Sequence, residues 1–114
     1  MTRMIYHMCP ADTWQEAVRT GTYHGTADDL RDGFIHFSTA EQIAESARRH
    51  RAGQAGLVLI AVESDRLADR LKWEKSRGGA LFPHLYGALD PAEVASVAPL
   101  PLGPDGEHIF PPLR

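Results

Sequence analysis

The sequence feature that most constrains the fold is the apolar run at residues 57–62 (LVLIAV), the longest uninterrupted one in the chain. A continuous run of this kind is typical of a central strand that is buried on both faces. Six residues are far too few to cross a bilayer. The run therefore predicts a central strand and not a membrane segment.

Five further strands are predicted from β-branched and aromatic content or from proline boundaries. They are expected at 4–9, 34–38, 71–76, 81–89 and 94–100. The order of elements, β-α-β-α-β-β-β-β, places the helices early and the strands late, which favours an α+β fold. The length of 114 residues is close to that of one typical domain, so a single domain over residues 1–114 is expected.

Two main helices and one helical turn are predicted. Trp14, Ala17 and Val18 share one face of a helix that starts at Pro10 and is closed by Gly21. A single helical turn is expected at 26–33, where Thr26 and Asp29 have capping spacing. The second helix is expected directly after residue 38, because Ser38 and Glu41 match the capping box S-x-x-E.

Composition excludes several classes of protein. The net charge of −3 argues against a generic nucleic-acid coat, which needs a basic surface. Cys9 is the single cysteine, so no intrachain disulfide forms, and no histidine pair has the spacing of a helical zinc site. No metal site, signal peptide or membrane segment is expected, and the cytoplasm is the expected location. The oligomeric state is left open.

The segment GFIHFST at 33–39 is the first candidate site. His36 is expected to face away from Ile35 and Phe37 by strand alternation. Ser38 and Thr39 lie where a strand is expected to become a helix, and a helix N-terminus favours phosphate or carboxylate. A second interpretation stays open, in which Ser38 only caps the helix and His36 is a hydrogen-bonded core histidine.

The segment WEKSRGGALFPHLYG at 73–87 is the second candidate site. His84 and Tyr86 are expected on one strand face, where a tyrosine ring can stack on a base and a histidine can exchange protons. Glu74 can bind a ribose hydroxyl or stabilise a developing cation. In the alternative, Glu74 pairs with a neighbouring lysine and the aromatic residues are core, which we expect for Trp73 and Phe82. His7, mid-strand at 4–9, is a secondary ligand-binding candidate.

Several segments resemble one known family over nearly the full chain. They are IYHM near the start, Trp14, DGFIHFST followed by Gln42, LVLIAV, LKWE with Ser76, and FPHLYG. This set resembles domain-of-unknown-function family 952, a bacterial family of small proteins. That resemblance implies no particular reaction.

A more distant similarity joins FIHFSTAEQIAESARRH to the V-H-L-S segment and following helix of RNA 2′-phosphotransferases. Those enzymes have the ADP-ribosyltransferase fold and use NAD. The similarity implies a split, mostly antiparallel sheet with two main helices early in the chain and a cleft for NAD. It places His36 and Ser38 at the V-H-L-S positions and makes Glu74 a candidate for a late acidic role. Transfer to RNA is not expected, because the chain is acidic and carries ARRH where that family has R-H-G.

Three functional hypotheses follow. In the first, an ADP-ribosyl-transfer-type enzyme uses NAD as substrate, with His36, Glu74 and His84 as catalytic residues. His7, Ser38, Thr39 and Tyr86 then bind the ligand. In the second, the same residues form a non-catalytic module for a nucleotide or another phosphate-bearing metabolite. In the third, the protein is a structural partner and these residues are core.

Overall fold

The apolar run at 57–62 forms the centre of a four-stranded antiparallel sheet, as predicted. The computed structural model describes residues 3–113, with the side chain of residue 77 excepted. The strand order is β3-β1-β4-β7. The bounds are β1 Met4–Pro10, β3 Ser38–Thr39, β4 Leu57–Glu63 and β7 Ser96–Leu100. β1 pairs with β4 along its whole length, from Met4 opposite Glu63 to Pro10 opposite Leu57.

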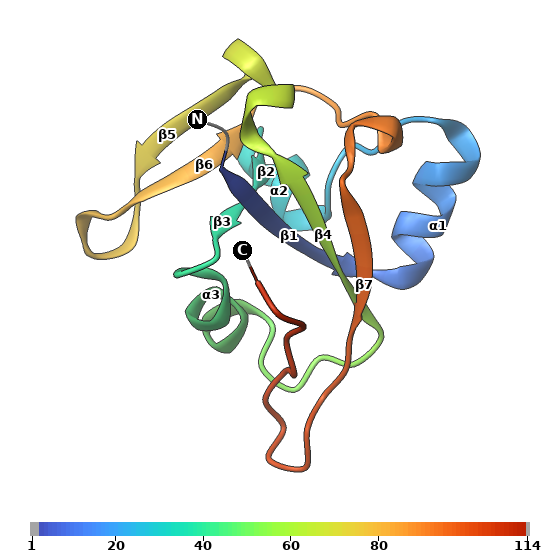
Figure 1. Ribbon diagram of the computed structural model, residues 1–114, viewed down its shortest axis with the longest axis vertical. Helices are drawn as coiled ribbons and strands as arrows, with labels where there is room; N and C mark the ends of the chain where they lie inside the picture. The colour runs from blue at the N-terminus through green and yellow to red at the C-terminus, as the bar shows by residue number, and fades with distance from the viewer. Residues whose placement is uncertain (1–2, 114) are drawn as a thin grey trace.

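Both faces of this sheet are covered, which explains the continuous hydrophobicity of β4. On one face, Ile60 and Val62 join a core with Trp14 of α1, the helix Ala11–Thr20. On the other face, Leu59 joins a second core with Ile43 of α3, the helix Ile43–His50. Figure 1 shows α1 and α3 on different sides of the sheet, with the C-terminal segment running in front of it.

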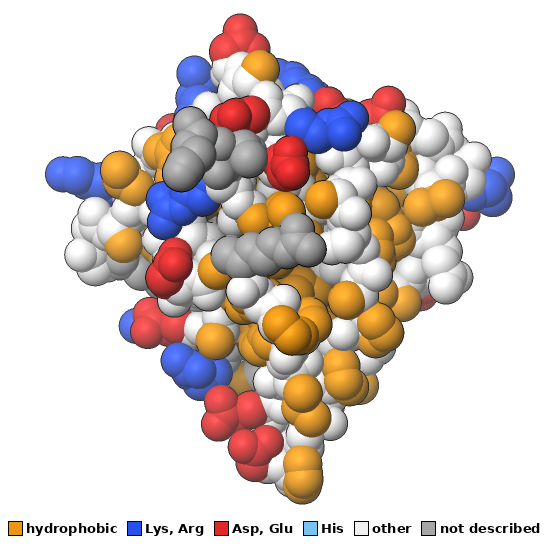
Figure 2. Space-filling model, viewed as in Figure 1, with side chains coloured by type: hydrophobic (Ala, Val, Ile, Leu, Met, Phe, Trp, Pro, Cys, Tyr) orange, Lys and Arg blue, Asp and Glu red, His pale blue; other side chains and the backbone are white. Residues whose placement is uncertain are grey.

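Apolar side chains remain on part of the surface. In the space-filling view they gather over β7 and the C-terminal segment (Figure 2). Val97 and Ile109 are 42% and 55% exposed. None of the helices in the described part of the chain has the length and apolarity that a bilayer crossing requires.

The early helices end as their glycines predict. α1 ends at Gly21 and α2, the helix Ala27–Asp32, ends at Gly33; both glycines have a left-handed backbone. Thr26 and Asp29 form the predicted capping box of α2. Val18, expected on the buried face of α1, is 56% exposed, so that prediction was wrong.

A second, three-stranded antiparallel sheet has the order β2-β6-β5. The bounds are β2 Ile35–His36, β5 Leu71–Lys75 and β6 Leu81–Leu85. The 3₁₀ turns are Ser64–Arg66, Ala68–Arg70, Arg77–Gly79 and Pro91–Glu93. β5 and β6 form a hairpin that projects from the body of the molecule, turned at Gly78 and Gly79 with positive φ (Figure 1).

Trp73 corrects the sequence interpretation of this hairpin. It was expected to be core, but its ring is 36% exposed and lies under the Arg3 guanidinium, 5.4 Å from the ring centroid. Phe82, expected to be core, is buried. One side of the hairpin therefore remains open to solvent.

The strand predicted at 34–38 is divided into two. His36 pairs with His84 of β6, whereas Ser38 pairs with Tyr6 of β1. Phe37 lies between the two pairings, and its N–H donates to the Pro83 carbonyl at 3.0 Å. The chain thus passes from one sheet to the other at Phe37.

The helix predicted directly after Ser38 begins later. α3 starts at Ile43 with Gln42 as its N-cap, so the capping box of Ser38 and Glu41 was wrong. Ser38 instead hydrogen-bonds the hydroxyl of Ser46 at 2.9 Å, because its strand pairing keeps it out of the helix. The α+β class is confirmed, and the three α-helices of the described residues are the two main helices and, as α2, the helical turn predicted at 26–33.

Candidate functional site

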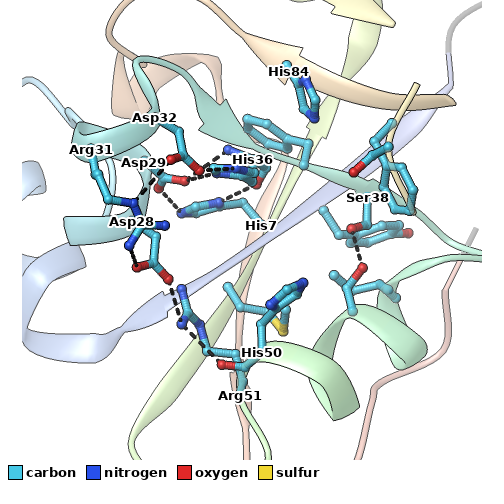
Figure 3. A pocket seen from close by; sticks show the side chains of 17 residues that line it. His7, Asp28, Asp29, Arg31, Asp32, His36, Ser38, His50, Arg51 and His84 are labelled. Carbon is cyan, nitrogen blue, oxygen red and sulfur yellow. Dashed lines mark hydrogen bonds and ion pairs between the residues drawn. The ribbon is translucent and has the colours of Figure 1, made fainter. Parts of the chain in front are cut away.

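A cleft of 230 Å³ lies where the two sheets part. Its walls come from β1, α2, the segment 36–38, α3 and β6, and Figure 3 shows their side chains turned toward a common space. The polar residues that line it are His7, Asp28, Asp29, Arg31, Asp32, His36, Ser38, Ser46, His50, Arg51, Ser76 and His84. Both candidate segments of the sequence contribute to this one cleft.

His36 and His84 bring the two segments together. They are register partners in the β2–β6 pair, and their ring centroids are 5.6 Å apart. Phe34 stacks on the His84 ring at 4.1 Å. The predicted alternation is confirmed, since Ile35 and Leu85 point into the core while the two histidines face the cleft.

Asp29 fixes one side of the His36 ring. Its Oδ1 accepts from His36 Nδ1 at 2.5 Å and from the His36 backbone N–H at 3.1 Å. Its Oδ2 accepts from the Thr26 backbone N–H at 2.7 Å and from the Thr26 hydroxyl at 3.0 Å. Burial acts to raise the pKa of Asp29, but hydrogen bonds and the nearby histidines outweigh it and lower the pKa from 3.8 to about 2.

Asp32 lies on the other side of the same ring. Its Oδ2 is 3.1 Å from His36 Nε2, and its side chain is 34% exposed against 2% for Asp29. His36 is therefore bracketed by a buried carboxylate at Nδ1 and by a more exposed one at Nε2.

His7 is enclosed by the protein. Its Nδ1 donates to the His36 carbonyl and its Nε2 accepts from the Tyr23 hydroxyl, both at 2.6 Å. Burial lowers the pKa of His7, and the nearby Asp29 only partly opposes this. Tyr23 is buried as well, and burial raises the pKa of its phenol. His7 lines the cleft wall as a neutral, fully hydrogen-bonded ring.

Glu74 holds His84 from behind. Its Oε1 accepts from His84 Nδ1 and from the Tyr86 hydroxyl, each at 2.8 Å. The hydrogen bond from His84, followed by that from Tyr86, lowers the pKa of Glu74. Neither Glu74 nor Tyr86 lines the cleft, and Glu74 reaches it only through His84. A predicted alternative, pairing of Glu74 with Lys72 or Lys75, is not what the structure shows.

Ser38 and Thr39 are separated by the structure. Ser38 lines the cleft, whereas Thr39 is buried away from it and its backbone N–H donates to Gln42 Oε1 at 3.0 Å. Because α3 starts at Ile43 with Gln42 as its N-cap, neither residue caps the helix, and the Ser38 hydroxyl meets its first turn at Ser46. Anion binding by Ser38 and Thr39 stays a prediction.

The five charged residues of the cleft, Asp28, Asp29, Arg31, Asp32 and Arg51, were all missed as site residues. Asp29 was recognised only as a cap, and its second role depends on His36 lying next to it in space. Asp32 and Arg51 have no sequence signal of their own. Arg51 is 18% exposed, and its Nε is buried with no hydrogen-bond partner among residues 3–113. Its Nη1 is 3.5 Å from Asp28 Oδ2 and donates to the His50 carbonyl at 3.3 Å.

The side chains of the cleft are imidazoles, which can exchange protons, and charged groups of both signs. No group of three or more potential metal ligands is found within the described residues. Burial raises the pKa of the Cys9 thiol to about 11, which leaves the thiol unreactive near neutral pH. The cleft offers imidazoles, hydroxyls, the guanidinium groups of Arg31 and Arg51 and the carboxylates of three aspartates to a ligand.

Comparisons with known proteins agree with this architecture. The profile of a family described as "Protein of unknown function (DUF952)" matches residues 8–97. The chain belongs to this family. A crystal structure of the protein CC0527 from Caulobacter crescentus is similar to this chain, with 48% identity, a TM-score of 0.90 and 93% of each chain covered. A solution NMR structure of CC0527 is 49% identical, with a TM-score of 0.82 and 91% and 90% coverage. No curated protein matches the chain.

Proposed function

We propose that the cleft binds NAD or a related phosphate-bearing nucleotide and that the protein is an enzyme of the ADP-ribosyl-transfer type. The observation that carries the proposal is the meeting of the two motif segments. His36 and His84 are register partners, and both face a cleft that also contains Arg51. A guanidinium and imidazoles in one concave site suit a phosphate-bearing ligand.

The size of the cleft limits how much of the ligand it encloses. Its 230 Å³ is below the roughly 300–1,000 Å³ of sites that enclose a drug-sized ligand. In the proposal the cleft holds one phosphoribosyl half of the dinucleotide, and the other half lies on the surface. A role for Tyr86 in stacking then requires the ligand to extend beyond His84 to the hairpin rim.

The residues divide the chemistry between them in this proposal. Arg51 binds phosphate oxygens, His36 binds a ribose hydroxyl, and Ser38 supplies a hydroxyl. The bond between ribose C1′ and nicotinamide breaks, its electron pair leaves with nicotinamide, and an acceptor oxygen attacks C1′. The proton of the acceptor passes to His84 Nε2, while the Glu74 carboxylate behind the ring stabilises the charge that develops.

The fold is compatible with this proposal. Two antiparallel sheets that part at Phe37 resemble the split sheet expected from the similarity to ADP-ribosyltransferases. The cleft lies at that parting, as an NAD cleft in such a fold would.

A non-catalytic binding module is the second candidate. It is favoured by the position of Glu74, which does not line the cleft, and by Asp29, whose two oxygens are already hydrogen-bonded. Few carboxylates are then free to stabilise a ribosyl cation. Turnover separates the two candidates, because both bind nucleotide but only the enzyme releases nicotinamide.

The test is a thermal-shift titration with NAD, ADP-ribose and nicotinamide. A ligand at about 100 times its Kd adds about 2.7 kcal/mol, which shifts a domain of this size by several degrees. The matched variants are His36→Ala and His24→Ala, a histidine on an exposed loop. We expect a shift with NAD that His36→Ala abolishes and His24→Ala retains, followed by nicotinamide release. No shift with any of the three ligands contradicts the proposal.

A further inference from the structure

Three of the four histidines that line the cleft share one feature, an oxygen acceptor at Nδ1. His7 Nδ1 faces the His36 carbonyl, His36 Nδ1 faces Asp29 Oδ1, and His84 Nδ1 faces Glu74 Oε1. Carbonyl and carboxylate oxygens accept hydrogen bonds, so each of these contacts favours the proton on Nδ1. At His36 the Asp32 carboxylate also faces Nε2, at 3.1 Å, and in a neutral ring the closer contact, 2.5 Å to Asp29, decides which nitrogen carries the single proton. In a neutral ring, Nε2 then carries the free lone pair.

The surroundings of Nε2 differ among the three rings. His7 Nε2 is occupied by the Tyr23 hydroxyl inside the protein. His36 Nε2 faces Asp32, a partly exposed side chain. His84 Nε2 has no hydrogen-bond partner among residues 3–113. Nε2 is therefore hydrogen-bonded inside the protein in His7, faces a carboxylate that a ligand can displace in His36, and is without a protein partner in His84.

We propose that Asp29 and Glu74 are positioning residues that hold His36 and His84 in the Nδ1–H form, so that Nε2 of each ring is the atom that meets the ligand. The contact with a ligand rests on the function proposed above, whereas the protonation pattern of the rings does not. One consequence concerns Asp32: a ligand hydroxyl that donates to His36 Nε2 has to displace the Asp32 carboxylate from that nitrogen.

The surroundings of Asp29 fix its carboxylate in the position that holds the His36 ring. Asp29 is 3% exposed, and one oxygen caps α2 while the other holds His36. A Cβ at Gly25 would lie 2.6 Å from Asp29 Cβ, and Gly25 has a φ of +103°. The glycine therefore leaves the room that the aspartate side chain occupies. Helix α2 and the ring of His36 are fixed by the same carboxylate.

The substitution Asp29→Asn reverses the pattern at His36. An amide has one acceptor and one donor end, and both sides of Asp29 present a backbone N–H. The Thr26 N–H is closer, at 2.7 Å, than the His36 N–H, at 3.1 Å, so the amide oxygen is expected to face Thr26. The NH₂ group then faces His36 Nδ1 and forces that nitrogen to accept, which moves the proton to Nε2.

The experiment is long-range ¹H–¹⁵N spectroscopy of the labelled imidazoles at about pH 9, where histidine rings are neutral. In the parent protein we expect protonated Nδ1 and unprotonated Nε2 for His36 and His84. Asp29→Asn should exchange the two signals of His36 alone. Glu74→Leu should give His84 a mixture of the Nδ1–H and Nε2–H forms. Glu74→Gln, which keeps an oxygen acceptor, should leave His84 in the Nδ1–H form. Asp28→Asn, a cleft acid with no histidine contact in the structure, is the control and should change neither ring.

Protonated Nε2 on both rings in the parent protein overturns the inference. An unchanged His36 spectrum in folded Asp29→Asn overturns it for Asp29. If Asp29→Asn does not fold, the variants Glu74→Leu and Glu74→Gln test the inference. Both are expected to fold, because the Glu74 side chain lies at the surface of the hairpin.

Titration of the same samples with NAD separates this inference from the proposed function. We expect Asp29→Asn to bind NAD about tenfold more weakly, the equivalent of one hydrogen bond to a charged group. No binding by the parent protein contradicts the proposed function while the spectra still test the rings. Equal binding by a variant whose His36 signals have exchanged contradicts the role of Nε2 and leaves the proposed function standing.

Discussion

The two sheets of this protein use histidine in opposite ways. In the four-stranded sheet, His7 is 3% exposed and both of its ring nitrogens are bonded inside the protein. In the three-stranded sheet, His36 lies between two carboxylates, Asp29 at Nδ1 and Asp32 at Nε2, and His84 has Glu74 at Nδ1. All three lie within strands, so position in a strand does not distinguish a structural histidine from a candidate site histidine. The distinction comes from the groups that surround Nε2 of each ring.

The sheets also differ in how completely they are covered. The four-stranded sheet is packed on both faces by α1, α3 and the C-terminal segment. The hairpin of the three-stranded sheet leaves Trp73 and Leu81 36% and 49% exposed. Stability is therefore expected to reside mainly in the first sheet and ligand chemistry in the second.

The two tryptophans test that division most strongly. Trp14 is 7% exposed against the four-stranded sheet, and Trp73 lies on the hairpin surface. We expect Trp14→Ala to lower the free energy of unfolding by about 3–5 kcal/mol through lost burial and a cavity. Trp73→Ala should cost less than about 1 kcal/mol. Urea denaturation measures both, and equal losses would contradict the division.

The histidines give the next largest effect. His7→Ala leaves the Tyr23 hydroxyl and the His36 carbonyl without their partner and opens a cavity, so we expect a loss of about 3 kcal/mol. His36→Ala, at a ring that is 40% exposed, should cost about 2 kcal/mol, because the buried Asp29 carboxylate loses its hydrogen bond from the ring. Chemical denaturation of the two variants measures both losses of unfolding free energy. A larger loss for His36→Ala than for His7→Ala would contradict the assignment of His7 as the structural ring.

The dependence of stability on pH follows from the same network. The pKa values of His7 and Asp29 are both lower in the folded protein than their ordinary values of 6.5 and 3.8. Their contributions are therefore complete above pH 6.5 and are lost as the pH falls. The loss begins below pH 6.5 with His7, and Asp29 adds about 2 kcal/mol between about pH 4 and pH 2.

Unfolding free energies measured between pH 8 and pH 2 test this profile. His7→Gln should flatten the slope just below pH 6.5, whereas His24→Ala on an exposed loop should keep it. A parent protein whose stability rises as the pH falls from 6.5 to 5 would contradict the neutral state of His7.

Arg51 gives the smallest of these effects. Removing its charge with Arg51→Gln should weaken NAD binding about tenfold, the loss of one charge-assisted contact. Arg48→Gln, an exposed arginine of α3 outside the cleft, should change the Kd less than twofold. Calorimetric titration measures both. Equal weakening in the two variants would mean that general surface charge, and not Arg51, attracts the ligand.

Local sequence signals predicted the elements better than the site. The central strand, the glycine ends of α1 and α2, the Thr26–Asp29 cap and the late strand followed from short-range chemistry that tertiary packing did not override. The capping box at Ser38 failed because Ser38 pairs with Tyr6 of β1, a contact remote in sequence. Competition between a local cap and a distant strand cannot be decided from spacing alone.

The candidate site was predicted only in part, again because some of its contacts join residues that are distant in the sequence. His36 and His84 were recognised from polar residues on apolar strands, and alternation gave their direction correctly. Arg51 was missed because it enters the cleft only through the way α3 packs on β1. Asp29 was recognised as a cap, but its bond to His36 needed the course of the chain through Gly33 and Phe34.

The most direct test of the central claim, that both motif segments form one working cleft, is an amide NMR titration with NAD. The claim predicts that the amide signals of His36, His84 and Arg51 shift together with one common Kd, while those of β7 stay in place. Shifts confined to one segment or to β7, or different Kd values for His36 and His84, would contradict it.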